Sequence, residues 1–243
     1  MKKLIALFSI SLLFYHCKPV IVNQEVKTAT ITSLELGNIG LPGRSLLEYK
    51  FNTTAIPALD NKIRVQVQPA TFNKAKFNIY LKASPANKLN LQYVDSSDSK
   101  PRFAELKIID KAAYINSINK DNEVLNYLKN QQDAKAVTSL SLALPHAQLN
   151  LINNAESVFL IYNGQLKKSY LQIADKTGNI TPVYFGDGVP FAYSTSGFCW
   201  QENENHQAVI ADITDAWNPC PSKTYRKASR AVKQQKEINY FKL

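Results

Sequence analysis

Residues 63–69 read Ile-Arg-Val-Gln-Val-Gln-Pro, and in the first six of them apolar and polar side chains alternate strictly. A period of two puts alternate side chains on opposite faces of a strand, so the pattern predicts a half-buried β-strand, which we expect Pro69 to end. Residues 77–82 and 89–93 repeat this alternation. Turn-forming residues separate the three segments, and we therefore predict a meander of three antiparallel strands.

The remainder of the chain contains further strand patterns. The clearest is a hairpin of residues 157–162 and 166–173, because the intervening Asn163-Gly164 favours the positive φ angles of a type I′ turn. Other strands are predicted at residues 28–36, 46–51, 104–109, 136–144, 181–185 and 208–213, with a loop at 37–43.

One segment has a helical pattern. Asp121 is a suitable N-cap for residues 122–132, whose apolar side chains fall on one side and which carry Glu123 in the first turn. The sequence therefore predicts a mainly β (α+β) fold of antiparallel, sandwich-like β-sheets with one helix near residues 122–132. The polar stretch 95–101 either divides the globular domain, residues 26–221, into two subdomains or forms one long hairpin loop.

The chain begins with a short apolar segment. Lys2 and Lys3 precede an apolar run, residues 4–15, which is shorter than the ~20 residues that a membrane span needs. A charged start followed by such a run is typical of a secretory signal peptide. The run is followed by Cys17 instead of a small-residue cleavage site.

This arrangement of residues 1–17 resembles bacterial lipoprotein precursors. The resemblance implies that residues 1–16 are removed and that Cys17 is acylated, with chains such as palmitate, and becomes the new N-terminus. Phe14, Tyr15 and His16 depart from the small residues usual before that cysteine. Two or more acyl chains give stable anchoring. The residue after Cys17 is Lys18 and not an aspartate. The resemblance therefore implies an outer-membrane lipoprotein that faces the periplasm, with residues 17–25 as anchor and tether.

The positive charge is concentrated at the C-terminus. The net charge is +10, and residues 222–243 alone carry seven lysines and arginines against one glutamate. Because the basic residues form a tail and no patch across the domain, the pattern argues against nucleic-acid binding. The tail is interpreted either as a solvated terminus or as a short helix that contacts anionic lipid headgroups.

Two further cysteines, Cys199 and Cys220, are expected to form one disulfide in an exported protein. Phe198 and Trp200 flank the first cysteine and Trp217 lies near the second. These aromatic side chains either cover the disulfide or form a binding surface.

The sequence offers little for catalysis or for metal binding. We expect His146 to be a packed or capping residue and His206 to be solvated, and a Cys199–His206–Cys220 set with Glu202 or Glu204 fits no zinc spacing. We therefore predict no metal and no cofactor. A carboxylate pair such as Glu202 with Asp212 is left open.

Two functions remain as hypotheses. The first is a non-catalytic outer-membrane lipoprotein that serves as an accessory or scaffolding subunit of an envelope protein complex. The second is a carbohydrate- or small-ligand-binding lipoprotein, hydrolytic in one version, which would stack its ligand on Trp200 and Trp217 and use Glu202, Glu204 or Asp212 as acids.

We expect the protein extracted from membranes to begin with an acylated Cys17. Mass spectrometry of the N-terminal peptide measures this directly. Cys17→Ser is the control, which should be soluble and folded, because the anchor lies outside the domain. An intact Met1 or an unmodified Cys17 would contradict the prediction.

Overall fold

The computed structural model describes residues 27–30, 34–43, 51–83, 89–97, 99–215 and 217–232. The predicted signal peptide, Cys17, the tether to residue 25 and residues 233–243 lie outside the described residues. The strands are β1 (Thr28–Ala29), β2 (Ile39–Pro42), β3 (Phe51–Ala55), β4 (Ile63–Thr71), β5 (Arg102–Ile108), β6 (Lys135–Ala143), β7 (Ser157–Asn163), β8 (Lys168–Ala174), β9 (Ile180–Tyr184), β10 (Val189–Glu202) and β11 (Ala208–Asp215). The helices are α2 (Lys74–Lys82), α3 (Lys111–Lys120), α4 (Asn122–Asn130), α5 (His146–Asn153) and α6 (Ala228–Ala231), with one 3₁₀ turn at Phe185–Asp187.

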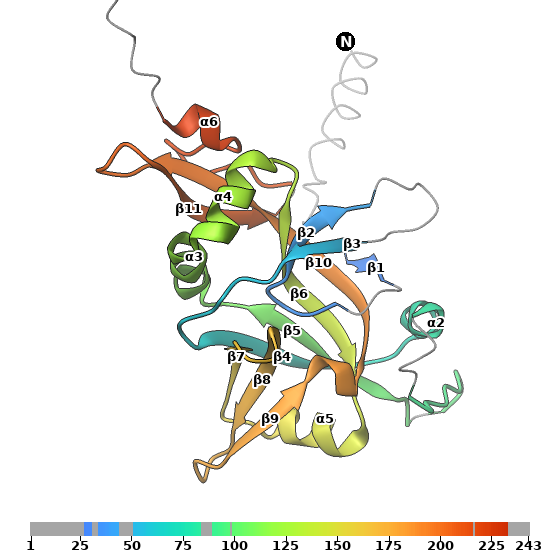
Figure 1. Cartoon of the computed structure of the whole chain (residues 1–243). Helices are drawn as coiled ribbons and strands as arrows, with labels where there is room; N and C mark the ends of the chain where they lie inside the picture. Colours follow the sequence, from blue (N-terminus) through green and yellow to red (C-terminus); the bar gives the residue numbers. More distant parts are fainter. Residues whose placement is uncertain are drawn as a thin grey trace, which may run out of the picture.

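The strands join in one curved sheet (Figure 1). Its order is β1-β10-β6-β5-β4-β7-β8-β9, with β11 added to β10 and the β2–β3 pair added to β6. Every strand pair in the described part of the chain is antiparallel. The mainly antiparallel β fold with few helices is therefore confirmed.

The alternation of apolar and polar side chains in residues 63–68 decides which face of the sheet packs in the core. Ile63 and Val65 are buried in the main hydrophobic cluster, and Arg64 between them is exposed. The neighbouring strand β5 follows the same rule, because Ala104, Leu106 and Ile108 pack in this cluster. The opposite face of β5 carries Phe103, which belongs to a second, smaller cluster under α2.

Pro69 does not end its strand. β4 continues to Thr71, and Pro69 lies opposite Ala104 of β5. On its other side β4 pairs with β7 only over residues 63–65. β4 is therefore an edge strand at Pro69, where the absent N–H of proline costs no ladder hydrogen bond.

The predicted three-stranded meander is wrong beyond β4. Residues 77–82 form part of α2, which Asn73 caps by accepting a hydrogen bond from Lys76 N at 2.8 Å. Phe77 and Tyr80 are buried one helical turn apart, so the segment uses its period of three to four and not its period of two. Residues 89–93 are not a strand either, although their apolar side chains pack against the smaller cluster.

The predicted helix near 122–132 is confirmed as α4, capped by Asp121. It is not the only helix, as α2, α3 and α5 show. Asp110 caps α3, and Asn119 of α3 hydrogen-bonds the backbone of Ile210 in both directions, at 2.8 and 2.9 Å. α3 thus satisfies polar backbone groups at the outer edge of β11, as an exposed sheet edge requires.

The predicted hairpin of β7 and β8 is confirmed, but its turn differs. The strands end opposite each other at Asn163 and Lys168, so the loop has four residues and not two. Asn163 accepts hydrogen bonds from the backbone N–H groups of Gln165 and Leu166, and Lys167 holds the positive φ of +49°. The asparagine side chain therefore organises this turn, and Gly164 does not provide its left-handed residue.

The longest strand, β10, was not predicted. Its pairing with β6 and β11 shifts register between Pro190 and Ala192, between Ser194 and Thr195, and between Cys199 and Trp200. Only the first of these shifts inserts an extra residue, Phe191, in β10 itself, because at the other two the extra residue lies on the partner strand. β10 is also buried on both faces over much of its length, so its apolar and polar side chains do not alternate.

Residues 95–101 do not separate two sheets. β4 and β5, which lie on either side of them in sequence, pair directly from Val65 to Thr71. Of the predicted strand 28–36, only Thr28–Ala29 is a strand, and residues 31–33 are outside the described residues. Most of the predicted strand 46–51 lies outside them too, whereas the predicted loop 37–43 contains β2.

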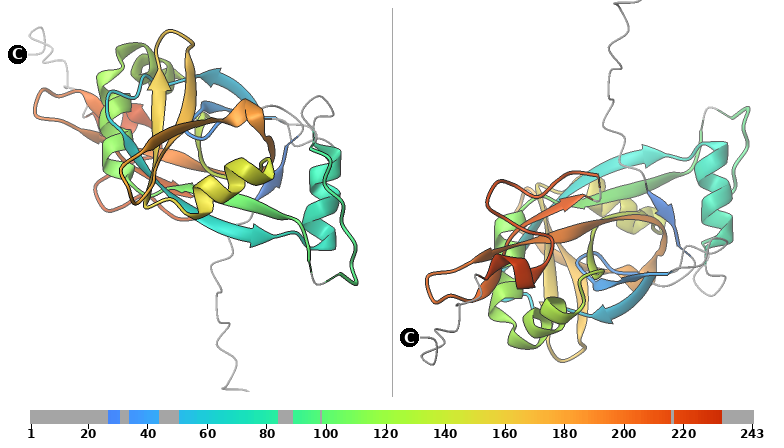
Figure 2. Two further views of the ribbon diagram at one scale, coloured as in Figure 1. Left: turned by 90° about the horizontal axis from the view of Figure 1, so that it is seen from below. Right: turned by 90° about the horizontal axis from the view of Figure 1, so that it is seen from above.

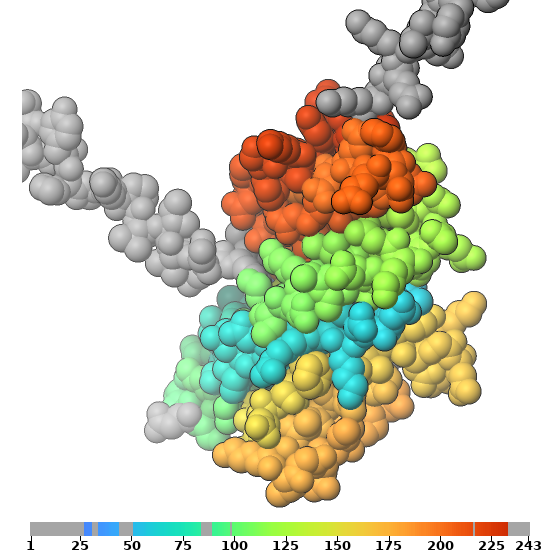
Figure 3. Space-filling view, turned by 90° about the vertical axis from the view of Figure 1, so that its left-hand side faces the viewer, coloured from blue at the N-terminus to red at the C-terminus, as the bar shows by residue number. Residues whose placement is uncertain are grey.

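The basic tail begins as part of the domain. Ala228 and Ala231 of α6 are buried in the main cluster, beside β10 and β11. Figure 3 shows this C-terminal segment, in red, at the opposite end of the molecule from the β7–β9 strands, in yellow. Within the described ranges, no helix combines the length and the apolar character that crossing a membrane requires.

We expect Leu106→Ala to lower the free energy of unfolding by about 2–5 kcal/mol, because Leu106 is fully buried in the main cluster. Urea denaturation measures the change. Leu166→Ala, at an exposed position, is the matched control and should change stability by less than about 0.5 kcal/mol. Equal effects of the two substitutions would contradict the assigned core.

Candidate functional site

A disulfide joins Cys199 of β10 to Cys220, with the Cα atoms 5.6 Å apart. This confirms the predicted pairing. The bridge ties the chain that follows β11 back to β10. Tyr225 strengthens this connection, because its N–H and C=O exchange hydrogen bonds with the backbone of Trp200 at 2.8 and 2.7 Å.

The predicted aromatic surface of Phe198, Trp200 and Trp217 is not formed. Phe198 and Trp200 are only 5% and 3% exposed and belong to the main core. The backbone of Trp200 pairs with β11 on one side and with Tyr225 on the other, and its side chain packs in the main core. The burial of these two residues agrees with the alternative interpretation, in which aromatic side chains pack around the disulfide.

Trp217 is the member of the set that reaches solvent, with 87% of its surface exposed. Its turn is held in place from both sides. Asn218 N donates to Asp215 O at 3.1 Å, and the Arg226 guanidinium donates to the carbonyls of Asp215 and Asn218 at 3.4 and 2.5 Å. The exposed indole is thus carried by a backbone fixed by the disulfide and by Arg226.

The acidic and histidine candidates do not gather in one site. His206, at the tip of the β10–β11 hairpin, contacts Glu202 with Nδ1 2.5 Å from Oε1, and Glu204 is exposed beside them. Asp212 lies opposite Cys199, three residues along β10 from Glu202, or about 10 Å at the rise of a strand. The expectation that His146 is packed or capping is wrong, because it is exposed as the first residue of α5, whose N-cap is Pro145, and its ring lies 3.2 Å from Asn150.

No metal centre is seen within the described residues, where no three or more histidine, cysteine, aspartate or glutamate side chains come close enough to hold an ion. Both thiols of the proposed zinc set are joined in the disulfide.

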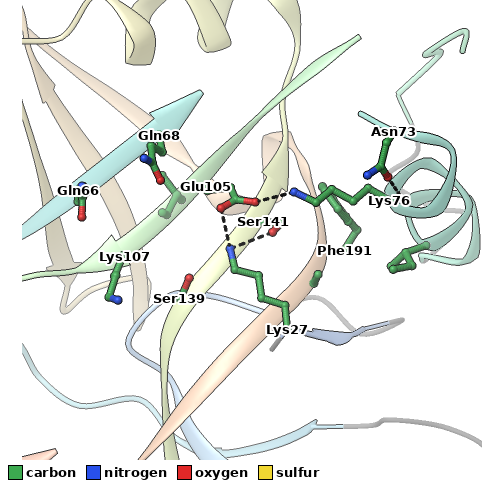
Figure 4. A pocket seen from close by; sticks show the side chains of 13 residues that line it. Lys27, Gln66, Gln68, Asn73, Lys76, Glu105, Lys107, Ser139, Ser141 and Phe191 are labelled. Atoms are coloured by element: carbon green, nitrogen blue, oxygen red, sulfur yellow. Dashed lines mark hydrogen bonds and ion pairs between the residues drawn. The ribbon is translucent and has the colours of Figure 1, made fainter. Parts of the chain in front are cut away.

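A different site lies on the outer face of the sheet (Figure 4). It is a cavity of about 640 Å³ between α2 and the strands β4, β5, β6 and β10. Figure 2 shows α2 standing away from the other helices, beside this part of the sheet. The residues that line it are mostly polar: Lys27, Gln66, Gln68, Asn73, Lys76, Glu105, Lys107, Ser139 and Ser141, with Ile79, Leu106, Phe191 and Ala192 as the apolar part.

Strand register arranges the floor of this cavity in two rows. Gln68, Glu105 and Ser141 lie opposite one another on β4, β5 and β6. Gln66, Lys107 and Ser139 form the adjacent row two residues further along. Both rows are the polar half of an alternating pattern whose apolar half fills the main core.

Glu105 lies between two lysines. Lys76 Nζ is 3.1 Å from Oε1 and Lys27 Nζ is 3.5 Å from Oε2, so each carboxylate oxygen faces one ammonium. Lys27 also donates to Ser141 Oγ at 3.1 Å, and Lys76 Nζ lies 5.1 Å from the centre of the Phe103 ring. Figure 4 shows Lys27, Lys76 and Glu105 converging from three elements.

The sequence patterns do not predict this site, although part of its signal is present in them. Gln66 and Gln68, the polar positions of the alternating stretch 63–69, line one side of the cavity floor. Ser139 and Ser141, two residues apart in an apolar strand, were the second signal. Lys27 and Lys76 could not be found in this way, because their place depends on how β1 and α2 pack on the sheet.

Comparison with family models, with curated proteins and with solved structures gave no match. A function must therefore be inferred from the geometry of the molecule.

We expect the double variant Cys199→Ser, Cys220→Ser to lose about 3 kcal/mol of unfolding free energy, because the bridge restricts the unfolded chain. Urea denaturation with and without reductant measures the loss. Reductant should lower the stability of the wild type by a similar amount and leave the double variant unchanged. Thiol labelling of both cysteines in denatured, unreduced protein would contradict the bridge.

Proposed function

We propose that the protein is a non-catalytic lipoprotein of the outer membrane, facing the periplasm, which acts as an accessory subunit of an envelope protein complex. The observation that carries this proposal is the exposed Trp217 on a turn held by the disulfide and by Arg226. Tryptophan is among the residues that contribute most to protein–protein affinity when its side chain is buried in a partner's pocket.

The fixed turn matters as much as the indole. A partner gains affinity when the contact group is already ordered, because less conformational entropy is lost on binding. An aromatic side chain buries about 150–250 Å² when it is covered, so one anchored indole is a substantial part of a small interface. A rigid, protruding tryptophan is therefore suited to docking.

The charge around Trp217 indicates the partner's surface. Residues 217–232 contain four lysines and arginines and no aspartate or glutamate, while the exposed Asp215 precedes Trp217 by two residues. Lys223, Lys227 and Arg230 are exposed together with Arg226. We infer a protein partner with an apolar pocket surrounded by acidic side chains, because such complementarity directs association and excludes other partners.

The predicted anchor limits where that partner is located. The ten residue steps from Cys17 to Lys27 span at most about 33–36 Å when fully extended. An acylated Cys17 would therefore keep the domain close to the membrane surface. A membrane-embedded or membrane-attached protein is the partner that this geometry favours.

Stacking of a carbohydrate on both Trp200 and Trp217, the second hypothesis, does not fit the positions of the two side chains. Trp200 is buried and Trp217 stands alone on its turn. The two indoles do not form a common platform.

We expect a photo-reactive phenylalanine at position 217 to give one crosslinked adduct with an envelope protein in intact cells. The same group at Leu166, exposed on the β7–β8 loop, is the control and should not give that adduct. After identification of the partner, Trp217→Ala should weaken the purified complex at least tenfold.

Two outcomes would contradict the proposal. One is an unchanged affinity of the complex after Trp217→Ala. The other is binding of the Cys17→Ser protein to vesicles of anionic lipid that Trp217→Ala abolishes, because the indole and the basic residues would then serve a lipid surface and not a protein.

A further inference from the structure

The cavity between α2 and the outer face of the sheet has no role in the docking proposed above. Its charged lining consists of three lysines, Lys27, Lys76 and Lys107, and one glutamate, Glu105. Its formal charge is therefore positive by two units. A cationic concavity attracts small anions, because the charges act together across a region partly screened from water.

Two of the lysines are held in position by the structure. Lys27 is only 14% exposed and is fixed between Glu105 and Ser141, whereas Lys76 is 42% exposed and reaches Glu105 from α2. Glu105 is shared between these two ammonium groups, one at each carboxylate oxygen. An ammonium has three N–H donors, which lets Lys76 bind Glu105 and a ligand anion at once.

The neutral side chains suit hydroxyl groups. Gln66 and Gln68 are exposed on the floor of the cavity, and each presents a donor and an acceptor. Ser139 and Ser141 lie beneath them and are only 2% exposed, and the Ser141 hydroxyl holds Lys27. Phe191 adds an apolar surface at the side toward α2. A volume of about 640 Å³ lies within the range of small-molecule sites, which extends from about 300 to 1,000 Å³.

We propose that this cavity binds an anionic sugar, that is, a small polyhydroxylated molecule carrying a carboxylate or a phosphate. Lys76 and Lys27 bind the anionic group beside Glu105. Gln66 and Gln68 bind the hydroxyl groups.

Isothermal titration calorimetry on the purified full-length protein in detergent tests the proposal with three probes. Glucuronate carries a carboxylate, glucose 6-phosphate carries a phosphate, and glucose is the neutral reference. We expect one or both anions to bind at least tenfold more tightly than glucose, and the anion affinity to fall when NaCl is raised from 50 to 500 mM. The two anions distinguish a carboxylate from a phosphate ligand.

Substitutions assign the binding to this cavity. Lys76→Met should weaken anion binding about tenfold, because it removes a charged hydrogen bond. Lys74→Met, on the same helix but outside the cavity, is the matched control and should stay within twofold of the wild type. Thermal unfolding of each variant shows whether it is folded.

Glu105→Gln gives a result of opposite sign. It removes the carboxylate that competes with a ligand for Lys27 and Lys76, so anion affinity should rise about threefold or more. If these ion pairs serve only to hold α2 and β1 on the sheet, Glu105→Gln instead lowers the melting temperature and does not tighten binding. That result, equal binding of glucose and the anions, or binding of neither anion at 10 mM, would overturn the proposal.

Discussion

The central strand β6 is the element on which the remaining structure depends. It pairs with β5 on one side and with β10 on the other, and it is buried on both faces. Leu140 and Leu142 point into the main core, while Ser139 and Ser141 point to the outer face. A strand enclosed in this way has its backbone hydrogen bonds satisfied on both sides, so its neighbours are fixed in register relative to it. Both the core and the polar cavity follow from that register.

The outer face shows how one sheet supports two environments. Phe103 and Phe191 pack under α2 in a small apolar cluster, and Glu105, two residues along β5 from Phe103, already belongs to the polar cavity. The ion pairs of Glu105 with Lys27 and Lys76 bring β1 and α2 to the same carboxylate. Such partly exposed pairs contribute modestly to stability, so their main effect is to orient the charged groups.

The opposite end of the molecule is organised by covalent and backbone constraints. The disulfide between Cys199 and Cys220, together with the Trp200–Tyr225 bridge, brings α6 against β10 and β11. In the segment connected in this way, Trp200 is buried and Trp217 is exposed to solvent. The two tryptophans of the segment closed by the disulfide therefore have opposite environments, because Trp200 lies in a strand and Trp217 on a turn.

The sequence by itself determined the fold class, most strands, α4 and the disulfide, because these depend on local periodicity, on a cap such as Asp121 and on the number of cysteines. It did not determine β10, which is buried on both faces over much of its length and so shows no alternation, nor residues 77–82, whose apolar side chains fit both a strand and a helix. For the cavity, the sequence showed the polar positions Gln66 and Gln68 of β4. Only the tertiary structure placed Lys27 and Lys76 around Glu105, because contacts between residues far apart in the chain are set by packing and strand register and leave no local pattern in the sequence.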